Sequence, residues 1–198
     1  MARTTMSDLI TQVRTRINAD TADYTIGTAN YWDADQIEGV LDRHRLEVWQ
    51  ASVAPLESYD GGGTVQYLDY PLGHEFLEQT DAGTAVFFLE AGDHTKIGTA
   101  NYSVDYDRGW VSFTADQKGS AYFLTARSYD LNGAAAEIWR QKAARFAESF
   151  DFSTDNMRVA HSQKLKHANM MADTFDKLST RGGFSVSTMI RSDVEVNP

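Results

Sequence analysis

The hydrophobic period of this chain changes twice along its length, and this change constrains the fold more than any other feature. Apolar residues near the start recur at helical spacing, at Leu9, Ile10, Val13 and Ile17. Across residues 61–129 apolar and polar residues instead tend to alternate, which is typical of strands. Turn signals such as Asp107-Arg-Gly109 separate the alternating segments and predict antiparallel pairing. After Gly133 the helical period returns.

Four helices and five strands are expected from these patterns. The first helix starts after Ser7, and the second follows Asp33, whose side chain can cap it together with Gln36. Apolar spacing that includes Val48 and Trp49 extends the second helix to a point before Pro55. Two further helices follow, one beginning after Gly133 and one ending near Leu178, with a break at 151–154. The expected strands are residues 64–70, 84–90, 101–106, 110–114 and 120–129.

The predicted fold class is α+β, with a helical bundle formed by both ends of the chain. Residues 1–56 and 131–181 form this helical body, because neither flank can bury its apolar stripe alone. Residues 57–130 form an inserted antiparallel β module, and residues 182–198 form an extended C-terminal arm. After two glycines the arm places apolar and β-branched residues at alternate positions: Phe184, Val186, Thr188 and Ile190. Such a strand lacks an obvious partner in its own chain, so we expect it to pair with another protein or subunit.

The hexapeptide IGTANY occurs twice, at residues 26–31 and 97–102. The first copy leads into a helical pattern and the second into a strand pattern, and the sequences around them differ. We therefore interpret the repeat as a turn used twice, and it does not predict two equivalent sites.

Composition excludes several classes of function. The chain has 198 residues and no cysteine, which excludes disulfides, thiolate zinc sites and a cysteine nucleophile. Its net charge of −10 argues against a dedicated nucleic-acid binder. Residues 57–130 alone carry 12 acidic and 4 basic side chains. No apolar run reaches the length of a membrane span and no signal peptide is evident, so we expect no membrane association and a cytosolic site of synthesis.

No motif points to catalysis, a cofactor or a metal. The five histidines include no pair at i,i+4, and the glycines at 61–63 precede neither Gly-Lys-Ser/Thr nor a helix. We therefore predict no catalytic, cofactor-binding or metal-binding residues, no cofactor and no enzymatic activity. Asp105 and Asp107 could serve as an acid–base pair, although solvated hairpin acids are commoner. The rings of Tyr102, Tyr106 and Trp110 could stack on a sugar or form a cross-strand cluster.

One segment near the end is basic. Between Arg158 and His167 there is no acid, and Arg158, Lys164 and Lys166 are accompanied by two histidines. This pattern fits either a solvated helix face or a weak contact with a DNA phosphate backbone or an acidic partner.

The order of segments along almost the whole chain resembles the head–tail connector adaptors of tailed bacteriophages, also called neck adaptor or head completion proteins. SDLITQVRTRI and WDADQIEGVLDRH resemble their opening helix pair, and YSVDYDRGWVSFTADQKGSAYFLTARSYDL resembles the β module inside some of them. AAAEIWRQKAARFAESFDFSTDN and SQKLKHANMMADTF resemble their closing helices.

The resemblance implies a structural virion protein at the neck, assembled in the host cytoplasm. It implies a homo-oligomeric, dodecameric ring between the portal protein and the next neck, stopper or tail protein, with double-stranded DNA passing transiently and non-specifically through its centre. The C-terminal arm would then contact the portal or a neighbouring subunit, and Arg158, Lys164 and Lys166 would face the DNA channel or an acidic partner. A glycan-binding or other accessory virion module that uses the β insertion is the alternative.

Overall fold

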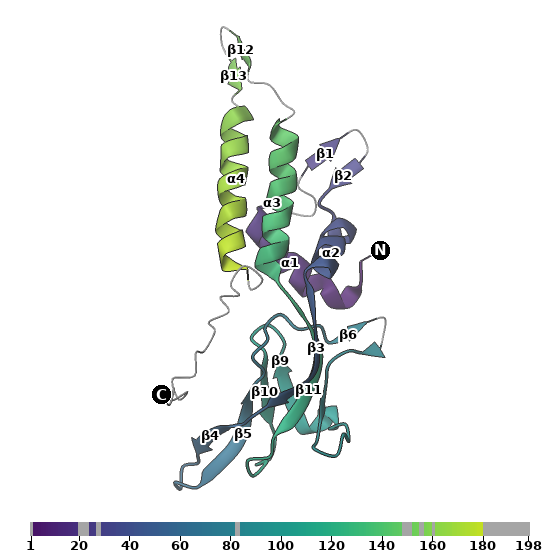
Figure 1. Cartoon of the computed structure of the whole chain (residues 1–198), viewed down its shortest axis with the longest axis vertical. Helices are drawn as coiled ribbons and strands as arrows, with labels where there is room; N and C mark the ends of the chain where they lie inside the picture. The colour runs from purple at the N-terminus through teal and green to yellow at the C-terminus, as the bar shows by residue number, and fades with distance from the viewer. Residues whose placement is uncertain are drawn as a thin grey trace, which may run out of the picture.

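The computed structural model describes residues 2–19, 24–26, 29–81, 84–147, 152–154, 157–159 and 161–179. Within them lie four α-helices, α1 (Ser7–Ile17), α2 (Ala34–Arg43), α3 (Leu131–Ala147) and α4 (His161–Leu178). Figure 1 shows the helices in the upper part of the molecule and the larger sheets in the lower part. Two short 3-10 helices, η1 (Thr4–Met6) and η2 (Thr99–Asn101), complete the helical elements of this part of the chain.

Two antiparallel sheets form the lower part. The first has the order β3-β11-β8 and consists of Arg45–Val53, Tyr122–Tyr129 and Phe88–Glu90. The second has the order β4-β5-β10-β9 and consists of Leu56–Tyr59, Val65–Pro71, Trp110–Phe113 and Tyr102–Asp105. Three two-stranded ribbons accompany them: β1 (Tyr24–Ile26) with β2 (Ala29–Tyr31), β6 (Thr80–Asp81) with β7 (Thr84–Ala85), and β12 (Phe152–Thr154) with β13 (Met157–Val159).

The first helix forms as its apolar spacing predicts. Its buried residues are the expected stripe, Leu9, Ile10, Val13 and Ile17. Asn18 ends α1 in the left-handed conformation, with φ of 52°, which asparagine tolerates better than most residues.

The start of the second helix is also confirmed. Asp33 accepts a hydrogen bond from the backbone N–H of Gln36 at 2.9 Å. The Gln36 side chain in turn accepts a hydrogen bond from the backbone N–H of Trp32. The N–H groups of Trp32, before the helix, and of Gln36, in its first turn, are therefore both hydrogen-bonded.

The expected end of the second helix is wrong. The helix stops at Arg43, and residues 45–53 form strand β3 along β11. The register passes from Val48↔Ala126 to Ala51↔Leu124 through a bulge. The bulge leaves Trp49 73% exposed, although helical spacing had placed it on a buried stripe. Pairing with a strand that lies far along the chain therefore decides the conformation of this segment.

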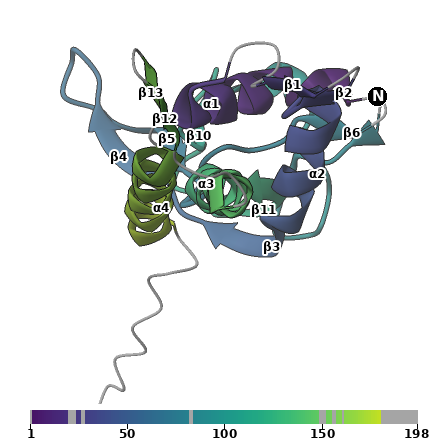
Figure 2. The ribbon, with the colours of Figure 1, turned by 90° about the horizontal axis from the view of Figure 1, so that it is seen from above.

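The expected helical bundle with an inserted module is also wrong. Figure 2 looks along α3 and α4, whereas α1 and α2 lie across the view, so the four helices do not share one bundle axis. Only His44 separates α2 from β3, and only Asp130 separates β11 from α3. The helical core includes Tyr129 from β11, so helices and sheet share packing. The structure is an α+β fold in which helices from both ends of the chain flank a β-rich middle.

A buried acid ties the N-terminal segment to the sheet. Glu78 is 1% exposed and accepts a hydrogen bond from the Tyr129 hydroxyl at 2.7 Å. Guanidinium nitrogens of Arg3 and Arg127 lie 3.7 and 3.6 Å from its carboxylate oxygens. Burial, together with the hydrogen bond to Glu78, raises the pKa of Tyr129. A buried carboxylate needs such partners, so this cluster fixes how the chain start meets β11.

Candidate functional site

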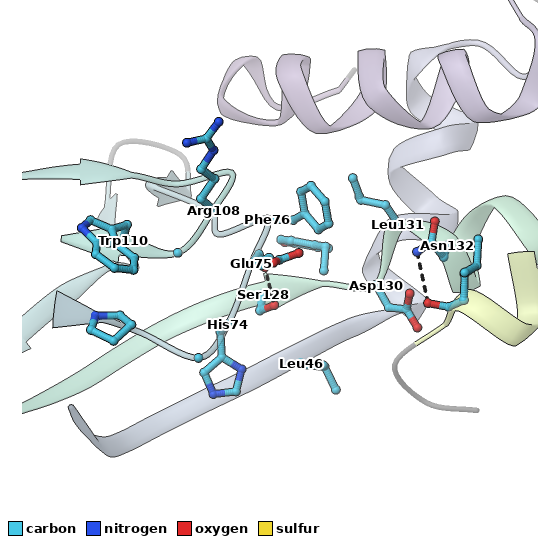
Figure 3. A pocket seen from close by; sticks show the side chains of 15 residues that line it. Leu46, His74, Glu75, Phe76, Arg108, Trp110, Ser128, Asp130, Leu131 and Asn132 are labelled. Carbon is cyan, nitrogen blue, oxygen red and sulfur yellow. Dashed lines mark hydrogen bonds between the residues drawn. The ribbon is translucent and has the colours of Figure 1, made fainter. Parts of the chain in front are cut away.

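A cavity of about 520 Å³ lies where the helices meet the sheets (Figure 3). Segments far apart in sequence enclose it, including β3, the loop after β5, the turn after β9, the end of β11 and the ends of α3 and α4. Its lining residues are Leu46, Pro71, Gly73, His74, Glu75, Phe76, Arg108, Gly109, Trp110, Ser128, Tyr129, Asp130, Leu131, Asn132 and Leu178.

Two turns with left-handed backbone shape one wall of the cavity. Gly73 and Phe76 have φ values of 70° and 53°, and Gly109 has 63°. At Gly109 a Cβ atom would lie 1.7 Å from the carbonyl oxygen of His74. Only glycine permits this approach, so the turn after β9 can lie directly against the loop after β5.

Several polar groups of the wall hold structural hydrogen bonds. Asp130 accepts from the N–H of Gly133 at 2.9 Å and from the Ser179 hydroxyl, so it caps α3 and holds the end of α4. Asn132 donates to the carbonyl oxygen of Leu178 at 3.1 Å. Ser128 donates to the carbonyl oxygen of Glu75 at 2.7 Å.

The remaining wall is mostly apolar. His74 is half-buried, and burial lowers the pKa of its imidazole, which favours the neutral ring at pH 7. Phe76 and Leu131 lie on the helical side of the view, and Trp110 on the sheet side (Figure 3). The cavity can therefore accommodate an apolar group, but these contacts do not arrange an acid, a base and a nucleophile around one reacting atom.

The acids and rings that could have carried chemistry have structural contacts. Asp105 accepts from the N–H of Arg108 at 3.1 Å, and Asp107 accepts from the Gln12 side chain at 2.9 Å. Tyr102 is buried in the sheet core, where its ring lies 5.6 Å from that of Phe113. Trp110 donates to Asp69 at 3.3 Å. Within the described residues no group of three or more His, Asp or Glu side chains is placed to hold a metal ion.

The predicted interface residues fall in two parts of the chain. Lys164 and Lys166 are exposed on α4. Arg158 belongs to β13, but its side chain is outside the described part, as are Phe184, Val186, Thr188 and Ile190 of the arm. The structure therefore brings two of the three basic residues onto one helix.

Five large apolar side chains of the described residues are exposed, and the sequence patterns did not single them out as a surface. Three lie on consecutive strands: Trp49 is 73% exposed, Leu56 45% and Tyr59 67%. Met170 and Leu178 on α4 are 58% and 61% exposed. Strand alternation places Leu56 and Tyr59 on opposite faces of β4, so it does not predict that both are exposed, and the exposure of Trp49 depends on the bulge in β3.

Comparison of this chain with protein-family models, with curated proteins and with solved structures finds no match. Among the described residues, no helix combines the length and the apolar character needed to cross a bilayer. Function therefore has to be inferred from the residues and surfaces of the chain itself.

Proposed function

We propose that this protein is a structural component of a tailed-phage neck, an adaptor that forms a ring between the portal and the next neck or tail protein. The order of its elements, two short helices, a β-rich middle and two longer helices, is compatible with the segments that resemble such adaptors. Met170 and Leu178 leave apolar surface of α4 exposed, which is compatible with a contact to a neighbouring subunit.

The main structural support for the proposal is that most of the surface of α4 is not packed against the rest of the chain. This helix has 18 residues and is about 27 Å long. Between Ser162 and Leu178 only Ala168 and Ala172 are buried. These two small residues let α4 lie close to α3, and most of its remaining surface is open (Figures 1 and 2). A long helix with so much open surface fits an assembly in which neighbours or a lumen lie beside it.

In the proposed ring the N-terminal half of α4 lies near the DNA channel or an acidic partner, and its two exposed lysines, two positions apart, project about 160° apart around the helix. Lys164 and Lys166 carry positive charge on the N-terminal half of the helix, and Arg158 precedes them in the chain. Few phosphate contacts of this kind give weak, salt-sensitive and non-specific binding. The net charge of −10 for the whole chain keeps DNA from adhering tightly. Weak contact suits a passage through which DNA must move.

The proposed attachment element is the C-terminal arm. Phe184, Val186, Thr188 and Ile190 would add a strand to the portal or to a neighbouring subunit, with backbone hydrogen bonds giving affinity and alternate side chains giving specificity. Because these residues lie outside the described part of the chain, their alternating sequence is the support for this step.

The test uses portal-bearing heads of the phage that encodes this chain. Full-length protein should bind the heads and allow tails to join. A chain lacking residues 184–198 should keep the same melting temperature but lose head binding. A Phe184→Ser, Val186→Ser, Ile190→Ser variant should behave like the deletion, whereas Thr188→Ser serves as the matched control and should bind normally. Normal tail joining by heads that lack the protein altogether would contradict the proposed function.

A further inference from the structure

The last helix of the described chain ends beside the cavity between the helices and the sheets. Leu178, the last residue of α4, lines this cavity and is 61% exposed. The next residue, Ser179, is buried, and its hydroxyl donates to Asp130, which also lines the cavity. Asn132 holds the carbonyl oxygen of Leu178 at 3.1 Å (Figure 3). These contacts fix the point at which the chain leaves α4, and that point lies at the cavity rim.

The cavity is large enough for an aromatic side chain and opens at the surface. Its volume of about 520 Å³ lies within the range of about 300–1,000 Å³ that is usual for ligand pockets. Its larger apolar lining residues are Leu46, Pro71, Phe76, Trp110, Leu131 and Leu178. Glu75 and Arg108 line it as well and are exposed. An apolar group can therefore enter the cavity and leave water by doing so.

The segment that follows α4 has the sequence and the length to turn back to this cavity. Residues 180–198 follow Ser179 in the chain and lie outside the described part. Gly182 and Gly183 permit backbone conformations that other residues avoid, so the chain can reverse its direction there. Phe184 is the first large apolar residue after Leu178 and comes five residues after Ser179. Five residues span at most about 18 Å, which is enough for a turn and a return to the rim.

We propose that Phe184 of the C-terminal arm occupies this cavity of its own chain while the subunit is free. A short linker gives Phe184 a high effective concentration at the cavity, which favours it over a group from another molecule. Docking also withholds an apolar, strand-forming segment from unwanted pairing.

The docked arm has to be held weakly. The arm must leave the cavity to reach the portal or a neighbouring subunit, and a docked fraction lowers its apparent affinity for them. This expectation of weak docking rests on the proposed function, whereas the docking itself rests on the cavity and on the exit of the chain. Weak docking adds little to the stability of the fold, so it has to be measured on the arm.

The test is limited trypsin digestion of the full-length protein, followed by mass spectrometry of the released C-terminal peptides. Docking holds the bond after Arg181 at the rim and slows its cleavage, because the protease acts on the released arm. Cleavage after Arg191, further along the arm, is the internal reference. Phe184→Ser should speed cleavage after Arg181 roughly twofold to fivefold. Phe184→Leu keeps an apolar side chain and should be cleaved like the unmodified protein.

Two controls separate docking from other effects on the protease. Synthetic peptides of residues 178–191 that carry the same changes measure its direct preference for the sequence. Leu46→Asn alters a half-buried lining residue and should speed cleavage after Arg181 as Phe184→Ser does. Leu56→Asn makes the same change at an exposed leucine that does not line the cavity, and it should leave the rate unchanged.

The outcomes distinguish the docking from the proposed function. Equal cleavage rates after Arg181 in the unmodified protein and in Phe184→Ser would overturn the docking and leave attachment to the portal untouched. Faster cleavage in Phe184→Ser but not in Leu46→Asn would overturn the cavity as the docking site. Faster cleavage in both variants supports the docking. If the chain lacking residues 184–198 then binds portal-bearing heads normally, the docking stands and the proposed attachment through the arm fails.

Discussion

At the scale of single residues, Trp139 shows how a side chain of α3 secures the first helix. It is 5% exposed, and its indole N–H donates to the carbonyl oxygen of Arg16 at 3.2 Å. The neighbouring Lys142 donates to the carbonyl oxygen of Ile17 at 2.7 Å. These carbonyls end α1 and lack partners within the helix. Trp49, by contrast, is exposed on β3 and takes no part in this core.

The two tryptophans give a matched pair of substitutions. Trp139→Ala should lower the free energy of unfolding by about 3–5 kcal/mol, since it removes a buried indole and leaves a cavity. Trp49→Ala should change it by about 0.5 kcal/mol or less, because its side chain is exposed in the isolated subunit. Urea denaturation of the monomer measures both. Equal losses of stability in the two variants would show that α3 or β3 has been placed wrongly.

Glu137 should make stability depend on acid pH. Burial alone would raise its pKa, but hydrogen bonds from Arg43 and His44 outweigh burial and lower it. The distances are 2.5 Å to Arg43 and 2.9 Å to His44. Because the folded pKa lies below the unfolded value, ionised Glu137 stabilises the fold above about pH 4.5, and this contribution is lost as the pH falls.

The measurement is urea denaturation of the unmodified chain and of Glu137→Gln from about pH 7 to about pH 3, a range that spans the titration of the carboxylate. The variant should be less stable at neutral pH, and the difference between the two proteins should shrink as the pH falls through the acid range. A difference that stays constant over this range would mean that the carboxylate charge does not contribute.

At the scale of elements, the sequence predicted those that depend on local spacing and capping. The buried stripe of α1, the Asp33 cap of α2 and the strands expected at 64–70, 101–106, 110–114 and 120–129 have local signals and are confirmed. The single strand expected at 84–90 is wrong, because this segment is divided between β7 and β8, which pair with β6 and β11 in different sheets. Residues 45–53 also contain apolar residues that fit a helix, so local spacing alone did not identify β3. Its pairing with β11 and the bulge at Gln50 determine the strand, and neither is a local property of the sequence.

The cavity, unlike these local elements, could not be predicted from the sequence. His74 and Phe76 belong to one loop, whereas Leu131 and Leu178 begin and end the two long helices. They meet only because β11 leads directly into α3. The close approach of Gly109 to His74 is a packing requirement, and a glycine in a turn does not reveal which backbone lies against it.

Two helical glycines should respond to the same substitution with opposite sign. At Gly39 in α2 an added Cβ would meet nothing within 4 Å, so Gly39→Ala should stabilise the protein by about 0.5–1 kcal/mol. At Gly133 in α3 a Cβ would lie 2.7 Å from Nδ1 of His44 and 2.8 Å from Asp130. Gly133→Ala should therefore destabilise the protein by about 1–3 kcal/mol. The melting temperatures of the two variants test this prediction. Shifts of the same sign in both variants would contradict the packing described at the start of α3.

At the scale of the whole molecule, charge is distributed unevenly along the chain. The acidic β-rich middle and the basic α3–α4 pair give the chain two unlike ends (Figure 1). The helical core and the sheet core each bury their own apolar residues, so the groups left open are surface features of a folded subunit. In the proposed ring the C-terminal arm meets the portal or a neighbouring subunit, and the lysines of α4 lie near the DNA or an acidic partner.

The most direct test of the central claim is native mass spectrometry of the purified full-length chain, with and without its portal protein, combined with electron microscopy of the same samples. The proposed function predicts a closed ring, dodecameric as in the adaptors it resembles, seated on the portal with an open centre. A particle that stays monomeric in both samples, or an open filament that the portal does not convert into a ring, would contradict it.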